Sequence, residues 1–154
     1  MKLFLVQHAK AASKEIDPER PLTEKGFNDI KKIAAFIKPL NLKVDYLWHS
    51  GKKRAQQTAE VLDDVINTTN DIAAQNCLAP NDDISTIKEK IISNQQDTMI
   101  VGHLPFLSKL ASMLLTGSES LEIVAFKQAG ILCLDCSDEN QWQLDWIITP
   151  EIMI

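Results

Sequence analysis

Short apolar segments alternate with amphipathic helical patterns along the first 114 residues, and this alternation constrains the fold more than any other feature. We expect strands at residues 2–6, 44–50, 71–77 and 97–103, and helical faces at residues 27–37, 55–66, 84–91 and 107–114. Alternation of strand and helix is typical of a parallel sheet covered by helices. The first segment, "KLFLV", is mostly apolar, as expected for a strand that is buried on both faces.

The C-terminal part has a different pattern, with three strand-like segments at 121–126, 130–136 and 142–148 and no helix between them. The polar stretch at 137–141 predicts a turn, so the last two strands should pair in antiparallel orientation. In the last strand, alternating apolar residues predict a single buried face: Trp142, Leu144, Trp146 and Ile148. We therefore expect a single α/β domain over residues 1–154. It should be a three-layer sandwich whose mostly parallel central sheet is flanked by helices and has an antiparallel edge near the C-terminus.

Composition excludes several classes of protein. Apolar residues make up 45% of the sequence and charged residues 24%, which is ordinary for a globular domain. No apolar run is long enough to span a membrane, and the apolar run before His8 is too short for a signal peptide. We therefore expect a cytoplasmic protein without a membrane partner. The net charge of −5 argues against binding to nucleic acid.

Three cysteines are consistent with reduced thiols. Cys133 and Cys136 have the spacing of some metal and redox sites. They lie in a predicted strand, however, where residues three apart point to opposite faces. We interpret them as small structural residues.

Polar residues follow three of the predicted parallel strands at the point where each strand ends. Ligands of open α/β sheets bind at this edge. The residues are Gln7 and His8 after the first strand, His49 and Ser50 after the second, and Gly102 and His103 after the fourth. We interpret His49 as structural or peripheral and Ser50 as a residue that shapes the turn.

Two arginines are expected near the same edge: Arg54 in the first turns of the second helix and Arg20 in the loop after the first strand. Their forked guanidinium groups suit a phosphate dianion. No cluster of carboxylates indicates a magnesium site. A neutral histidine can attack phosphorus while a second one stabilises charge. This pattern predicts metal-free phosphoryl transfer without a cofactor.

Four segments in chain order resemble motifs of the histidine phosphatase (phosphoglycerate mutase-like) superfamily. The best match is its short branch, the SixA-type phosphohistidine phosphatases. The segments are "LVQHAKA" at 5–11, "RPLTEKG" at 20–26, "SGKKRAQQTAEVL" at 50–62 and "VGHLP" at 101–105. The resemblance implies that His8 becomes phosphorylated and that water then hydrolyses the phosphohistidine. It also implies that His103, Arg54 and Arg20 contact the phosphoryl group.

Two positions depart from the superfamily pattern Arg-His-Gly, because this chain has Gln7-His8-Ala9. Glutamine still donates a hydrogen bond but lacks the charge and the fork of arginine. Loss of a charge-assisted hydrogen bond worth about 1.5–3 kcal/mol slows a reaction roughly tenfold to a hundredfold. Lys10 adds a cation nearby, which either compensates for the missing arginine or is simply solvated.

A proton donor for the leaving group is less clearly indicated. Asp82 and Asp83 are candidates, although Asp83 could equally cap the next helix. A phosphohistidine substrate needs a strong acid less than a phosphate ester does. The short chain has little length for a closing cap, which favours a phosphorylated protein as the substrate. Two alternatives are a phosphatase acting on a small phosphorylated molecule and a phosphate-binding regulatory module with weak or no turnover.

Overall fold

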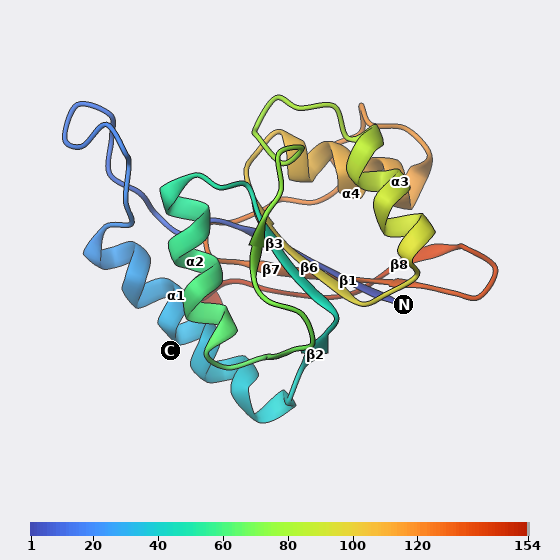
Figure 1. The fold of residues 1–154 in the computed structure, drawn as a ribbon, viewed down its shortest axis with the longest axis horizontal. Coiled ribbons are helices and arrows are strands. Elements are labelled where there is room, and N and C mark those ends of the chain that lie inside the picture. The colour runs from blue at the N-terminus through green and yellow to red at the C-terminus, as the bar shows by residue number, and fades with distance from the viewer. Residues whose placement is uncertain (154) are drawn as a thin grey trace.

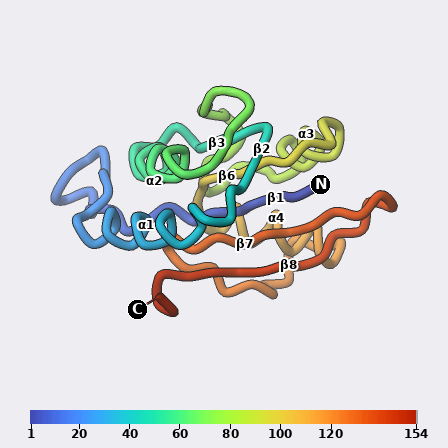
Figure 2. The backbone as a smooth tube through the Cα atoms, turned by 90° about the horizontal axis from the view of Figure 1, so that it is seen from below, coloured from blue at the N-terminus to red at the C-terminus, as the bar shows by residue number. Residues whose placement is uncertain are grey.

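A six-stranded sheet forms the centre of the protein, for which a computed structural model describes residues 1–153. The strand order is β5-β3-β6-β1-β7-β8, and Figure 2 shows the last five strands side by side in this order. The bounds are β1 (Lys2–Gln7), β3 (Tyr46–His49), β5 (Ala73–Ala74), β6 (Thr98–Gly102), β7 (Ile131–Cys136) and β8 (Trp142–Ile148). Neighbours from β5 to β1 pair in parallel, whereas β7 and β8 add an antiparallel edge, as predicted.

Four helices cover the sheet: α1 (Glu24–Ile37), α2 (Lys53–Asp63), α3 (Ser85–Asn94) and α4 (Phe106–Thr116). In Figure 1, α1 and α2 lie on one side of the strands, and α3 and α4 lie on the other. The core is divided accordingly. Phe4 and Val6 of β1 belong to the apolar cluster with α1 and α2, whereas Leu3 and Leu5 belong to the cluster with α3 and α4. The three-layer prediction is confirmed.

The start of α1 packs directly against the backbone segment that follows β1. Thr23 caps the helix, because its side-chain oxygen accepts a hydrogen bond from Gly26 N. Thr23 N also donates to Lys10 O over 2.9 Å. A Cβ atom on Gly26 would lie 2.1 Å from the same carbonyl oxygen. Glycine is therefore required here by close packing of two backbone segments.

Several predicted bounds are wrong. Residues 121–126 form no strand, because Val124 and Phe126 pack on the core while Leu121 and Ile123 remain half-exposed. The weak strand at 71–77 shrinks to β5. The helix predicted to reach Ile66 ends at Asp63, after which β4 (Asn67–Thr68) pairs with β2 (Lys43–Val44) in a second, two-stranded sheet. Two 3₁₀ turns, η1 (Lys38–Leu40) and η2 (Pro150–Ile152), complete the secondary structure of the described residues.

A β-bulge changes the faces of β8. Trp146 lies opposite Cys133, but Leu144 lies opposite the next residue of β7, so Asp145 is an extra residue in the ladder. Trp142 therefore packs with the α3 and α4 cluster, whereas Trp146 packs with the α1 and α2 cluster. The prediction of a single apolar face is wrong, and Leu144 is 51% exposed.

The cysteines are free, and Cys133 and Cys136 are buried. Burial raises the pKa of the Cys133 thiol to about 12 and also raises the pKa of Cys136, which leaves both thiols protonated and unreactive at neutral pH. Among the described residues, no helix has the length and apolar character needed to cross a bilayer.

Candidate active site

The register of the sheet brings the two sequence-predicted histidines together. Gln7 pairs with Gly102 in the parallel β1-β6 ladder, and His8 N continues the ladder by donating to Gly102 O over 3.0 Å. His8 and His103 therefore leave the sheet at the same level, with their ring centroids 5.0 Å apart and their planes inclined at 52°. The site lies at the carboxyl ends of the parallel strands, as predicted.

The hydrogen bonds of His8 determine which of its nitrogens can react. His8 Nδ1 lies 2.7 Å from Ala9 O. A carbonyl oxygen only accepts, so Nδ1 carries the proton. Burial, together with the smaller effects of the nearby Arg54 and Arg20, lowers the pKa of His8 to about 4. His8 is thus neutral at pH 7, and its Nε2 has a free lone pair.

His103 has a different arrangement. Its Nε2 lies 2.6 Å from Ser50 Oγ, which itself accepts a hydrogen bond from Lys52 N. Burial lowers the pKa of His103 to about 3, and His8 and Arg54 also lower it. His103 Nδ1 is buried and has no hydrogen-bond partner among the described residues. A neutral His103 that accepts a hydrogen bond from the Ser50 hydroxyl at Nε2 has its N–H at Nδ1.

Both sequence-predicted arginines line a cleft of about 790 Å³. Arg54 lies in the first turn of α2, and its Nε is buried without a partner among residues 1–153. Burial and the nearby Arg20 lower the pKa of Arg54. Arg20 Nε donates to Ala12 O over 3.0 Å, and the Arg20 backbone has φ 51°. A left-handed backbone costs on the order of 1 kcal/mol in a residue other than glycine, so its presence beside two histidines is a feature typical of functional sites.

Two polar residues of α2 hold the segments around His8 in place, and the sequence predictions gave them no role. Thr58 Oγ1 accepts a hydrogen bond from Ala9 N over 3.0 Å and donates to Arg54 O. Gln57 Oε1 accepts from Leu22 N over 2.8 Å. These contacts explain why the "RAQQT" segment carries these side chains next to Arg54. Ser50 is a third such residue, because it contacts His103 as well as shaping its turn.

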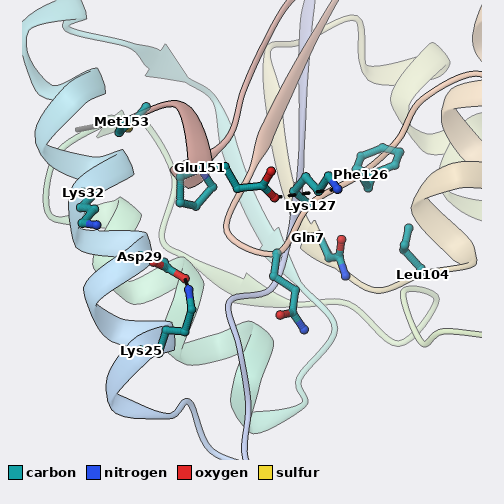
Figure 3. A pocket seen from close by; sticks show the side chains of 11 residues that line it. Gln7, Lys25, Asp29, Lys32, Leu104, Phe126, Lys127, Glu151 and Met153 are labelled. Carbon is teal, nitrogen blue, oxygen red and sulfur yellow. Dashed lines mark hydrogen bonds and ion pairs between the residues drawn. The ribbon is translucent and has the colours of Figure 1, made fainter.

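Gln7 lies beside His8 but lines a different pocket, of about 530 Å³, between α1, η2 and the segment before β7. Figure 3 shows Gln7 in this pocket with Leu104, Phe126 and Lys127. Gln7 Oε1 is buried and lacks a hydrogen-bond partner among the described residues. Lys10, the cation considered as a replacement for the missing arginine, is exposed and lines neither pocket.

The two candidate acids differ in position. Asp82 lines the cleft with the arginines, and its Oδ2 accepts a hydrogen bond from Ala79 N. Asp83 is exposed and does not line the cleft; hydrogen bonds from Ser85 lower the pKa of its carboxyl. It therefore holds the start of α3. His49 Nδ1 accepts from Gly51 N, which supports a structural role in the turn.

Comparison with known proteins finds similarity to one family of phosphatases. Residues 3–76 match the model of the histidine phosphatase superfamily (branch 1). Over this stretch, just under half of its 154 residues, the chain is similar to the histidine phosphatase superfamily. At the level of the superfamily, the activity is that of a phosphatase. No group of three histidine, cysteine, aspartate or glutamate side chains that could hold a metal ion occurs within residues 1–153.

Individual relatives act on different classes of substrate, according to their names. Phosphohistidine phosphatase SixA of Escherichia coli is 23% identical over 97% of this chain and 94% of its own length. The fold is that of the protein histidine phosphatase SixA complexed with tungstate (TM-score 0.84, 22% identity, 97% of both chains). It is also that of the alpha-ribazole phosphatase from Shigella flexneri (TM-score 0.78, 15% identity, 97% of both chains).

Proposed function

We propose that the chain is a metal-independent phosphatase that carries the phosphoryl group on His8 and removes phosphate from phosphohistidine in a protein. The geometry of His8 carries this proposal. Its Nδ1 proton is donated to Ala9 O, its depressed pKa keeps the ring neutral, and its Nε2 is free to attack beside Arg54 and Arg20. An unprotonated ring nitrogen next to two guanidinium groups is what attack on a phosphate dianion requires.

The reaction has two displacement steps. In the first, the Nε2 lone pair of His8 forms a bond to phosphorus while the bond to the leaving nitrogen breaks, and the leaving imidazole keeps the proton it gained beforehand from solvent. In the second, water attacks the phosphoryl group, its proton is released, and His8 returns to its neutral form. Arg54, Arg20 and the Nδ1–H of His103 are the donors for the phosphoryl oxygens, and Ala9 O accepts the Nδ1 proton of His8 throughout.

The candidate acids favour phosphohistidine as the substrate. An ester oxygen needs a proton donor as it leaves, but Asp83 is exposed outside the cleft, and Asp82 accepts a backbone hydrogen bond. An imidazole leaves a phosphohistidine as a neutral ring when its other nitrogen carries a proton, and solvent can supply this proton near neutral pH because imidazole titrates near 6.5. The name of the SixA relatives supports the same substrate class.

Trapping of the intermediate tests the proposal. We expect a phosphohistidine peptide to add 80 Da, about the mass of one phosphoryl group, to the rapidly quenched protein, with the label on the His8 peptide. The variant His8→Asn should lose the label and all turnover, and His49→Asn is the matched control that retains both. Labelling of another residue, or turnover by His8→Asn, would contradict the proposed nucleophile.

Two alternatives follow from specific observations. Small phosphorylated molecules are candidate substrates because a relative with the same fold is named an alpha-ribazole phosphatase. A phosphate-binding module without turnover is a candidate because Gln7 lies at the position of the superfamily arginine and its Oε1 lacks a partner. Comparing the kcat/KM of a phosphohistidine peptide with that of p-nitrophenyl phosphate separates the first alternative from the proposal. Isothermal titration with tungstate, combined with the absence of a phosphoenzyme, would identify the second.

Gln7 provides a second prediction. Gln7→Arg restores a forked cation at the end of β1, so we expect the rate of His8 phosphorylation to rise about tenfold, the worth of one charge-assisted hydrogen bond. Rapid-quench kinetics measure this rate. Gln7→Met removes the polar group at similar size and should not accelerate the step. An unchanged rate in Gln7→Arg would show that the missing charge does not limit the reaction.

A further inference from the structure

Five cationic side chains line the 790 Å³ cleft beside the catalytic histidines. They are Lys14, Arg20, Lys52, Lys53 and Arg54. None of them forms an ion pair with a carboxylate of residues 1–153. The cleft contains two carboxylates, Glu19 and Asp82, and Asp82 is already hydrogen-bonded to Ala79 N. The cleft is therefore strongly positive although the whole chain has a net charge of −5.

The pocket that contains Gln7 is a useful comparison within the same molecule. It also has several lysines, but Lys25 is paired with Asp29 at 2.6 Å and Lys127 with Glu151 at 3.8 Å, as Figure 3 shows. Charges there are largely compensated by the protein itself. In the cleft, five cations face two carboxylates and none of the cations is ion-paired within residues 1–153, so an external anion gains most by binding there.

The positive cleft is larger than one phosphoryl group needs. Arg54 and Arg20 are close enough to both histidines to lower their pKa values, which makes these two arginines the candidates for holding the phosphoryl oxygens. Lys14 and Lys53 are not among the residues expected to contact the phosphoryl group. Both are exposed: Lys14 lies in the loop before α1, and Lys53 is the first residue of α2. Their position extends the positive surface away from the reacting atoms along the cleft.

We propose that this cleft docks an acidic segment of the phosphorylated protein, next to its phosphohistidine, with Lys14 and Lys53 contacting Asp or Glu side chains. The inference rests on the proposed function, because it specifies which phosphoproteins the site accepts. Contacts between exposed charges act mainly on association and are screened by salt. The acidic segment should therefore lower KM at low ionic strength and have little effect on kcat.

Two synthetic phosphohistidine peptides of equal length test the docking. One has four glutamates on one side of the phosphohistidine, and the other has four serines. We expect the KM of the serine peptide to be about tenfold higher than that of the acidic peptide in 20 mM salt. The ratio of the KM of the serine peptide to that of the acidic peptide should approach one in 0.5 M salt. In the double variant Lys14→Glu/Lys53→Glu the ratio should fall to one or below. The control Lys32→Glu/Lys43→Glu makes the same change of charge at exposed lysines outside the cleft and should keep the wild-type ratio.

The outcomes separate this inference from the proposed function. If both peptides are dephosphorylated through His8 with equal KM, or if the control variant loses the preference as fully as the cleft variant, acidic docking is wrong and the phosphatase assignment stands. If neither peptide is dephosphorylated, fluorescence anisotropy with the unphosphorylated glutamate peptide still tests the cleft: binding lost only in the cleft variant supports docking, and no binding refutes it. Tighter binding of a single-stranded oligonucleotide of the same charge would also refute it.

Discussion

At the scale of single residues, the imidazoles of His8 and His103 differ in the hydrogen-bond partner that orients each ring. His8 donates to a carbonyl, which fixes its protonated nitrogen without help from any side chain. His103 depends on Ser50, whose hydroxyl can either donate or accept. Because Lys52 N already donates to the same oxygen, donation of the hydroxyl proton to His103 Nε2 satisfies all three groups.

Ser50 is therefore a positioning residue whose loss has a specific signature. We expect Ser50→Ala to lower kcat about tenfold through one lost hydrogen bond, with a smaller change in KM. Nitrogen-15 NMR should show His103 protonated on Nδ1 in the wild-type protein and a mixture of tautomers in Ser50→Ala. Ser50→Thr keeps the hydroxyl and should restore both readouts. If His103 has the same tautomer in Ser50→Ala as in the wild type, Ser50 acts on the turn alone.

At the scale of elements, the contact between α1 and the segment after His8 should reverse the stability change that helix propensity predicts for replacing Gly26 with alanine. Alanine is ordinarily about 1 kcal/mol better than glycine inside a helix. Gly26→Ala should instead destabilise the protein by about 1–3 kcal/mol, because its Cβ would overlap Lys10 O, a backbone atom that cannot rotate away. Urea unfolding measures the change.

Ala35 is the matched control in the same helix, because it is exposed. Ala35→Gly should cost about 1 kcal/mol by propensity alone and leave activity unchanged. In Gly26→Ala the displaced Lys10 segment should also lower kcat, since this segment follows His8 directly. Stabilisation by Gly26→Ala would show that the two backbones can separate freely.

Much of the fold could be predicted because long elements have a clear period. β1 and β6 are identified by continuous apolar runs, and the four helices by apolar residues that recur on one helical face. The two-residue strands β2 and β4 are too short to show a period, and the bulge at Asp145 arises from pairing with β7, which is not visible in the sequence of β8 alone. Residues 121–126 have the composition of a strand, but they bury side chains without pairing their backbone.

The candidate site could be predicted to a similar extent. We could propose His8, His103, Arg54 and Arg20 as site residues because polar residues follow apolar strands and because four motifs occur in order. Their supporting contacts could not be predicted: Thr58 reaches Ala9 across 49 positions, and Ser50 reaches His103 across 53. Such contacts depend on strand order, because β6 lies between β1 and β3 in the sheet but comes after both in the chain.

At the scale of the whole molecule, the buried histidines link stability to pH. The folded-state pKa values of His8 and His103 are about 4 and about 3, whereas an unfolded histidine titrates near 6.5. Between pH 6.5 and about 4 the unfolded chain therefore binds protons that the folded chain does not. The free energy of unfolding should fall as the pH falls through this window, by up to about 1.4 kcal/mol per pH unit for each histidine.

The variant His103→Gln isolates this effect, because glutamine does not titrate and preserves a group able to bond Ser50. We expect its free energy of unfolding to fall less steeply than that of the wild type between pH 6.5 and pH 4.5, whatever its stability at pH 7. Urea titrations at several pH values give both slopes. Equal slopes would mean that His103 gains its proton as easily in the folded state as in the unfolded state.

The hydrogen bond from His8 to Ala9 O has a chemical consequence for the proposed phosphohistidine intermediate. Phosphohistidine exists as two regioisomers, with phosphorus on either ring nitrogen. A phosphoryl group on Nδ1 would displace the proton that Ala9 O accepts and would force phosphorus and its oxygens against this carbonyl oxygen, which lies only 2.7 Å from Nδ1. The enzyme should therefore form one isomer, with phosphorus on Nε2, and the phosphorus-31 chemical shift of the trapped protein would identify it directly.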